Sequence, residues 1–274
     1  MTDTTERAGV DNAGVRRFRL LDLFSGIGGF SLGLEQSGNF QTVAFCEIEP
    51  FPRRVLRKHW PDVPIYEDVR TLIAERLAAD GISVDAICGG FPCQPFSTAS
   101  RGRRVAPDLW PEMLRVIDAT RPAVVIAENV GEAPISHAAT ALRERGYRTV
   151  VIRVSADDAG ADHQRDRWWA CAYADLEGEL HGPLNAEVAK LSALRRSIWS
   201  PENYARAIRV PDGLPHRLDR PRIEALGNSI MPVIASAIGR AFGALLREYT
   251  RARIPVEYTR SRVATLPTPE PSHE

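Results

Sequence analysis

The sequence predicts an α/β fold built on a mostly parallel sheet. Short apolar runs alternate along the chain with amphipathic stretches, which is the pattern of strands joined by helices. A glycine-rich turn follows the first apolar run, and polar residues stand directly after several of the others. Ligands of such sheets lie beyond the carboxyl ends of the strands, so these polar residues mark one shared crevice.

Length and composition allow one large domain with a small appendage. The 274 residues are 44% hydrophobic, and 35 basic residues balance 35 acidic ones. No charged-then-apolar leader and no long apolar run is present, so we expect a cytoplasmic protein without a membrane segment. The four cysteines lack paired spacing, which indicates neither a disulfide framework nor a metal site.

The first predicted strand leads into the glycine turn. Residues 18–24 (FRLLDLF) form an apolar run, and a helix is predicted over 30–36. Between them stand four small residues: Ser25, Gly26, Gly28 and Gly29. Glycines allow a tight turn and a close approach of the backbone to a ligand. Residues 1–17 are polar and aperiodic, which predicts disorder.

Acidic residues follow the next two predicted strands. Glu47 ends the strand at 42–46, at a spacing that suits a ribose-binding carboxylate; helix capping is the alternative. Asp68 follows a short strand at 65–67. It could accept a hydrogen bond from an exocyclic amine or serve as an N-cap, and the two roles are compatible. The helices predicted here cover 51–60 and 69–79.

A cysteine between two prolines follows the strand predicted at 84–88. Cys93 lies within residues 89–97 (GGFPCQPFS), a rigid turn that suits the presentation of a nucleophile better than a core. The loop at 98–107 carries three arginines, Arg101, Arg103 and Arg104. This composition fits a phosphate-attracting loop, and a merely solvated loop is the alternative.

Another carboxylate and an arginine pair extend the crevice. Glu128 follows a strand at 123–127, and burial there is expected to raise its pKa and make it a proton donor; capping is the alternative. Arg165 and Arg167 stand two residues apart, so both point to one side of an extended segment. The remaining elements predicted here are helices over 108–119 and 137–145 and strands over 147–154 and 168–173.

The last third of the chain changes character. Region 174–222 is polar with broken periodicity, and we expect a small insertion there. Its arginines are Arg195, Arg196, Arg206 and Arg209. Region 223–250 contains an apolar helix at 231–246 that is expected to complete the first domain (18–173), and 251–274 is expected to be disordered. All but two basic residues of the chain are arginine, which fits a GC-rich genome or contacts with phosphates and bases.

Five motifs together resemble those of the cytosine-C5 DNA methyltransferase family. They occur in the family's order: 22–29 (DLFSGIGG), 90–97 (GFPCQPFS), 128–130 (ENV), 165–167 (RDR), and 227–229 (GNS) followed by Pro232. The resemblance implies a Rossmann-like S-adenosylmethionine-dependent methyltransferase fold with a mixed, mostly parallel sheet and a small target-recognition insertion at 174–222. It implies S-adenosylmethionine as the cofactor and double-stranded DNA as the partner. We expect a monomer without a metal.

The resemblance also implies a role for each motif. Cys93 would attack C6 of a flipped-out cytosine, and Glu128 would hold the N3 and N4 edge and protonate N3. Arg167 would pair with O2, supported by Arg165, and the Phe91 carbonyl would accept from N4. The implied cofactor pocket comprises Phe24, Ser25, Gly26, Gly28, Gly29, Glu47, Ile48, Asp68, Val69, Pro92, Leu109, Asn228 and Ser229. The implied DNA contacts are Gln94, Ser97, Arg101, Arg103, Arg104, Arg195, Arg196, Arg206 and Arg209.

Three departures from the family pattern stand out. His163 occupies a place where the family often has glutamine, and the motif usual before residue 227 is barely recognisable at 211–222. The third is the short region between Tyr173 and Pro211, where the family places sequence recognition; this compact form resembles phage or prophage members. The expected activity is DNA (cytosine-5-)-methyltransferase, for restriction–modification or phage DNA methylation. The alternatives are an RNA cytosine methyltransferase, a non-catalytic DNA-binding protein, and transfer of a modified group.

Overall fold

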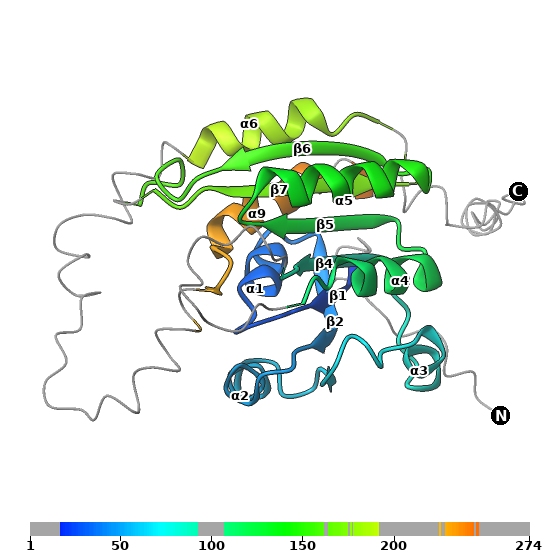
Figure 1. Ribbon diagram of the computed structural model, residues 1–274. Helices are drawn as coiled ribbons and strands as arrows, with labels where there is room; N and C mark the ends of the chain where they lie inside the picture. The colour runs from blue at the N-terminus through cyan, green and yellow to red at the C-terminus, as the bar shows by residue number, and fades with distance from the viewer. Residues whose placement is uncertain are drawn as a thin grey trace, which may run out of the picture.

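A seven-stranded sheet forms the centre of the computed structural model (Figure 1). The strand order is β3-β2-β1-β4-β5-β7-β6; β1 to β5 pair in parallel, and β7 is antiparallel to both β5 and β6. The predicted mixed, mostly parallel sheet is confirmed. The strands are β1 Phe18–Leu23, β2 Phe40–Cys46, β3 Ile65–Tyr66, β4 Ala86–Gly90, β5 Val124–Asn129, β6 Arg148–Val154 and β7 Arg167–Tyr173.

The structure describes only part of the chain. Its described residues are 17–92, 107–161, 164–174, 176, 178–191, 225, 228–243 and 245–246. The helices among them are α1 Gly29–Gln36, α2 Pro50–His59, α3 Ala74–Ala79, α4 Trp110–Thr120, α5 Glu132–Glu144, α6 His181–Leu191 and α9 Pro232–Ala241. Each helix within these residues is too short or too polar to cross a lipid bilayer.

Strands with two buried faces organise the core. Neighbours such as Leu20 and Leu21 on β1, or Ile126 and Ala127 on β5, are both fully buried but belong to different hydrophobic clusters. Alternate residues of a strand point to opposite faces, so the apolar runs of the sequence supply both clusters. Helices α1, α6 and α9 contribute to one cluster, and α3, α4 and α5 contribute to the other.

Helix α9, from the last part of the chain, returns to the first helix. It packs against α1 and α6. In Figure 1, α9 is orange, α1 is blue and α6 is yellow-green. A Cβ added at Gly33 of α1 would meet the Pro232 carbonyl and, at 2.7 Å, the Ala235 side chain, so the two helices are in close backbone contact. That the C-terminal helix completes the first domain stays a prediction.

Three helices differ from the sequence-based expectation. Helix α3 begins at Ala74 instead of residue 69, because a turn led by Asp68 occupies residues 69–71. Helix α5 begins at Glu132, five residues earlier than predicted; its Pro134 falls in the first turn, where a missing N–H costs little. Helix α6 was not predicted, and its buried Leu184 and Leu191 join the core cluster of α1 and α9. It lies inside the region 174–222 assigned to target recognition, and that division of domains stays a prediction.

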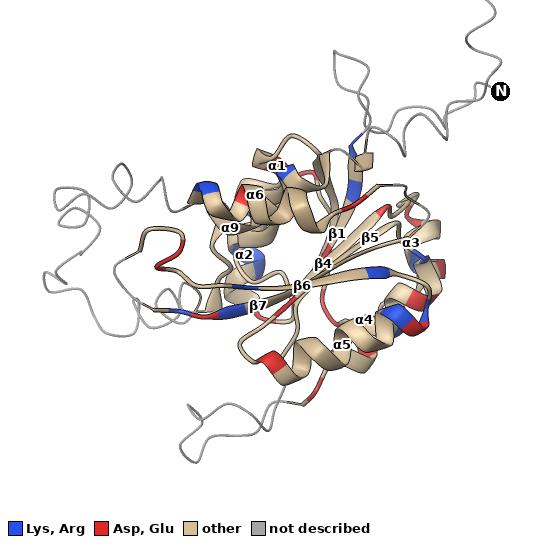
Figure 2. Cartoon of the chain, turned by 90° about the horizontal axis from the view of Figure 1, so that it is seen from above, with Lys and Arg blue, Asp and Glu red and all other residues tan. Residues whose placement is uncertain are grey.

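The sheet reverses its order at β1, which places the functional positions. Strands β2 and β3 lie on one side of β1, and β4, β5, β7 and β6 lie on the other. The carboxyl ends of β1, β2, β4 and β5 therefore share one edge, and ligands of open α/β sheets bind at this kind of reversal. In the view of Figure 2 both signs of charge lie on the outer helices, and the sheet between them is mostly uncharged.

Candidate active site

The turn after β1 is tightly wound. Phe24, Gly26 and Gly28 have φ angles of 54°, 54° and 86°, in the left-handed region that favours glycine. The Ser25 hydroxyl donates to the Asp22 carbonyl at 2.6 Å, and it accepts from the Cys46 amide at 3.2 Å. Ser25 thus ties the ends of β1 and β2 together beneath the turn.

Glu47 joins the glycine turn to the start of α2. Its two carboxylate oxygens accept hydrogen bonds from the backbone amides of Gly26 and Glu49, each at 2.7 Å. The side chain is buried, and burial raises its pKa. Glu49 is the N-cap residue of α2, so the capping alternative for Glu47 does not hold. Each carboxylate oxygen keeps a further lone pair, and ribose binding stays a prediction.

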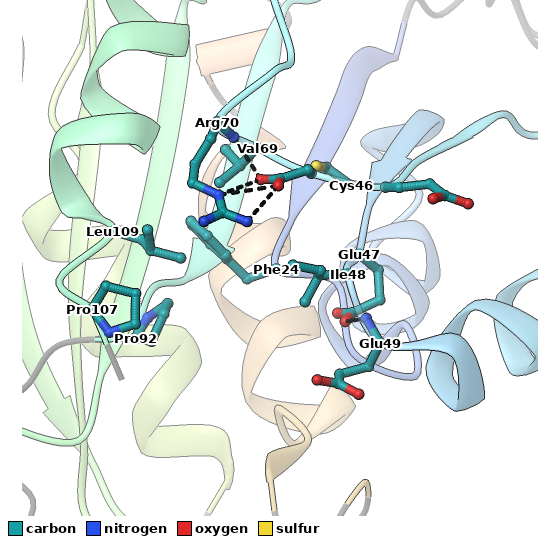
Figure 3. Close-up of a pocket in the computed structure, with 12 residues that line it drawn as sticks. Phe24, Cys46, Glu47, Ile48, Glu49, Val69, Arg70, Pro92, Pro107 and Leu109 are labelled. Atoms are coloured by element: carbon teal, nitrogen blue, oxygen red, sulfur yellow. Dashed lines mark hydrogen bonds and ion pairs between the residues drawn. The ribbon is translucent and has the colours of Figure 1, made fainter. Parts of the chain in front are cut away.

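A cavity of about 440 Å³ lies beyond these turns (Figure 3). Figure 3 shows Phe24 in its middle, with Ile48 on one side and Leu109 on the other. Seven predicted cofactor residues line it: Phe24, Glu47, Ile48, Asp68, Val69, Pro92 and Leu109. Five further lining residues were missed: Cys46, Glu49, Glu67, Arg70 and Pro107. Closeness in sequence could have identified three of them, because Glu49, Glu67 and Arg70 lie within three residues of the predicted carboxylates Glu47 and Asp68.

Asp68 is engaged by its neighbour Arg70. The Arg70 Nε lies 2.9 and 3.0 Å from the two carboxylate oxygens and its Nη2 lies 2.6 Å from one of them, and this pairing lowers the Asp68 pKa. The Arg70 backbone amide also donates to Asp68, which forms the turn that replaces the first part of the predicted helix. The expectation that Asp68 caps a helix is therefore wrong: Ile73 is the N-cap residue of α3.

Close packing also favours glycine at positions 28 and 29 of the turn, because a Cβ atom at either position would collide with a neighbour. A Cβ at Gly28 would lie 2.7 Å from the Trp60 ring, and one at Gly29 would lie 2.7 Å from the Ser229 hydroxyl. Ser229 thus lies beside the glycine turn although it is distant in sequence, and its role in the cofactor pocket stays a prediction. Ser25, Gly26, Gly28, Gly29, Asn228 and Ser229 are not among the residues that line the cavity.

A second group of predicted residues meets at the end of β5. The Glu128 carboxyl is 8% exposed, its Oε1 lies 2.9 Å from the Arg167 Nε, and its Oε2 lies over Gly90. Burial raises the pKa of Glu128 to about 7, although Arg167 and then Arg165 oppose the shift. The Oε1 atom has no hydrogen bond among the described residues, because the approach of Arg167 is a charge contact without hydrogen-bond alignment.

Two polar groups near Glu128 already have partners. Arg165 donates to the Ser229 carbonyl at 2.8 Å, which joins the lead into β7 with the segment before α9. Asn129 donates from Nδ2 to the Phe91 carbonyl at 2.8 Å. That carbonyl retains one lone pair for the predicted contact with N4 of a base.

The predicted nucleophile lies just outside the described part of the chain. The described residues stop at Pro92, which lines the cavity, and resume at Pro107. Gly90, which lies beside Glu128, stands three residues before Cys93 in the sequence. The described cysteines, Cys46, Cys88 and Cys171, are buried, and burial raises the pKa of Cys46 and Cys171 to about 12, so they are poor nucleophiles. Also outside are His163, Gln94, Ser97, Arg101, Arg103, Arg104, Arg195, Arg196, Arg206 and Arg209. Within the described residues, no group of His, Cys, Asp and Glu side chains could hold a metal ion.

Comparison with known proteins relates the chain to DNA methylases. A family model described as C-5 cytosine-specific DNA methylase matches residues 18–204. The chain is 42% identical over 117 residues to Type II methyltransferase M.NgoMIV of Neisseria gonorrhoeae (42% of this chain), and 30% identical over 164 residues to Type II methyltransferase M.HgiBI of Herpetosiphon aurantiacus (56% of this chain). It spans only 36% of the length of each.

A solved structure shares the fold. It is the crystal structure of a protein described as a DNA modification methyltransferase encoded within an E. coli prophage. The TM-score is 0.60 at 20% identity, and the match covers 84% of this chain and all of that chain. Unlike the two relatives, this protein is matched over its whole length.

Proposed function

The chain belongs to the C-5 cytosine-specific DNA methylase family, and from this premise we propose that it transfers a methyl group from S-adenosylmethionine to C5 of cytosine in double-stranded DNA. The observation that carries the proposal is the buried Glu128 carboxyl, held beside Arg167 at the carboxyl edge of the sheet and over Gly90. This supports a role for Glu128 as a proton donor, since Gly90 lies three residues before Cys93 in the sequence.

The cavity suits S-adenosylmethionine in size and chemistry. Its volume of about 440 Å³ lies in the range of small-molecule sites. Phe24, Ile48 and Leu109 offer apolar surface to an adenine ring, and Glu47 offers a buried acceptor to a ribose hydroxyl. Among the described lining residues, four carboxylates face one arginine, Arg70, which favours a cationic ligand: Glu47, Glu49, Glu67 and Asp68. When bound, this cofactor supplies an electrophilic methyl group on a positively charged sulfur.

The residues of the chain make cytosine C5 nucleophilic. The Cys93 thiolate adds to C6, and the electron pair displaced from the C5–C6 double bond spreads over the ring toward N3. Glu128, neutral below about pH 7, donates its proton to N3 as that charge develops. C5 then accepts the methyl group as the bond from that methyl to sulfur breaks, and neutral S-adenosylhomocysteine is left. Loss of the C5 proton to a base re-forms the double bond and expels Cys93, and N3 returns its proton to Glu128.

The target base must leave the DNA stack, because neither face of C6 or C5 is accessible within the duplex. We propose that Arg167, whose Nε lies 2.9 Å from the Glu128 Oε1, pairs with O2 of a base bound beside Glu128. The proposed biological roles are restriction–modification, as in the Type II relatives, or methylation of phage DNA. We further propose that the chain acts as a monomer.

Labelled S-adenosylmethionine distinguishes this function from its rivals. The purified protein is incubated with duplex DNA or with tRNA, and label is counted in each. We expect label in DNA only, and none with Cys93→Ser, which should still bind the cofactor. Label in tRNA alone would assign the enzyme to RNA. Absence of label from both substrates would support a non-catalytic DNA-binding protein.

A further inference from the structure

Asp22 is a fully buried acid that the proposed chemistry does not use. It lies on β1 two residues before Phe24, with 0% exposure, between the buried Leu21 and Leu23. A buried carboxyl is a poor choice for stability alone, because desolvation costs more than a few hydrogen bonds return. Its contacts therefore indicate what it does.

These contacts pin the start of α1 onto β1. The Asp22 Oδ2 accepts a hydrogen bond from the Ser31 hydroxyl at 2.7 Å, and the Ser31 backbone amide also donates to this carboxyl. Ser31 is the third residue of α1, and Gly28, the N-cap residue of that helix, supplies no side-chain cap. The Asp22 carboxyl takes the place of that cap from a neighbouring strand. The Cys88 thiol on the neighbouring strand β4 opposes part of the rise that burial causes in the Asp22 pKa.

Phe24 lies in the short turn between β1 and α1, whose two ends are joined by the contact of Asp22 with Ser31. Its φ of 54° is a conformation that glycine adopts freely and a phenylalanine does not. Strained residues of this kind persist only where their surroundings over-determine them. Here β1 fixes one end of the turn, Asp22 fixes the other through Ser31, and Ser25 is tied to the Asp22 carbonyl. The ring of Phe24 then lies in the cavity wall.

We propose that Asp22 is a positioning residue of the cofactor site, which holds the Phe24 ring against the cavity by closing the turn between β1 and α1. This inference rests on the proposed function, since it takes the cavity to bind S-adenosylmethionine. Asp22 itself touches neither cofactor nor base.

The test is a set of cofactor affinities in three backgrounds at position 24. Asp22→Ala is combined with the natural Phe24, with Phe24→Ala and with Phe24→Gly, and the Kd for S-adenosylmethionine is measured by calorimetry. Phe24→Ala removes the ring but keeps the strained backbone, whereas Phe24→Gly removes both, so the two are matched controls. We expect Asp22→Ala to weaken binding about tenfold, equivalent to about 1.4 kcal/mol, beside Phe24, and less than twofold beside Phe24→Ala or Phe24→Gly, because both variants lack the ring that Asp22 positions.

Two further variants keep the test decisive. Asp22→Asn retains an acceptor for Ser31 and should restore most of the affinity. Ser31→Ala replaces Asp22→Ala throughout if the latter does not fold. An equal loss in all three backgrounds, or no loss beside Phe24, would overturn the inference and leave the proposed function intact. A wild-type protein that does not bind S-adenosylmethionine would overturn both.

Discussion

At the scale of single residues, Glu128 determines what the site can do at a given pH. Its carboxyl is buried beside Arg167, and burial raises its pKa from 4.5 to about 7. Between these values the folded protein keeps a proton that the unfolded chain has lost. The contribution of Glu128 to the free energy of unfolding is therefore most favourable below about pH 4.5 and is lost as the pH rises through about 7.

Glu128→Gln should remove that loss together with the activity. The amide stays neutral, so the unfolding free energy of the variant should rise relative to wild type by up to about 3 kcal/mol between pH 4.5 and pH 8. Urea unfolding of both proteins at several pH values measures this difference. The pKa of Asp22 is also raised to about 7, but its titration affects both proteins equally and drops out of the comparison. The methylation rate should fall by about 10² or more. Identical pH dependence in the two proteins would contradict the assignment of the raised pKa.

The sequence predicted the carboxylates of the site but not all of their partners. A strand end is visible as the end of an apolar run, so Glu47, Asp68 and Glu128 could be placed at one edge before the fold was known. Three hydrogen bonds of the site depend on side-chain conformation and on distant segments. They join Arg70 to Asp68, Asn129 to the Phe91 carbonyl, and Arg165 to the Ser229 carbonyl. A single sequence encodes none of these directly.

At the scale of elements, the close contact of α1 and α9 positions the glycine turn. Helix α9 presses its first residues against Gly33, and Ser229 before it reaches Gly29. Sequence periodicity predicted both helices but not their contact. Helix α6 escaped prediction because only Leu184 and Leu191 of its eleven residues are buried, which leaves little apolar periodicity.

Gly33→Ala tests that helix contact. The added methyl group would meet the Pro232 carbonyl, and we expect it to destabilise the protein by about 1–3 kcal/mol and to weaken cofactor binding. Gly182→Ala in α6 is the matched control, because its Cβ would meet open space; it should be neutral or stabilising by less than about 1 kcal/mol. Thermal unfolding of the two variants decides the matter, and equal stability would show that α1 and α9 do not pack this closely.

At the scale of the whole molecule, charge gives no general attraction to DNA. The chain carries equal numbers of basic and acidic residues, and both signs are spread over the described helices (Figure 2). If the chain binds DNA as proposed, the affinity has to come from local groups, and we expect these to be the arginines at 101–104 and those of the region 174–222.

The arginine loop should contribute charge and not sequence preference. Changing Arg101, Arg103 and Arg104 to Gln should weaken DNA binding about equally for different sequences. It should also lower the salt dependence of log K by about one unit for each phosphate that the loop no longer neutralises. Fluorescence anisotropy at several salt concentrations measures both. S-adenosylmethionine affinity is the control and should not change. A change in sequence preference would instead place these arginines on base edges.

Covalent trapping tests the central claim most directly. In duplex DNA with 5-fluorocytosine at the target, fluorine replaces the proton that must leave C5, so a methylated adduct cannot release the enzyme. Intact-mass spectrometry should show the wild-type protein joined to the DNA strand plus one methyl group, only with S-adenosylmethionine present, and should show no adduct with Cys93→Ser. Absence of the adduct from a wild-type protein that binds both DNA and cofactor, or its persistence in Cys93→Ser, would contradict the account.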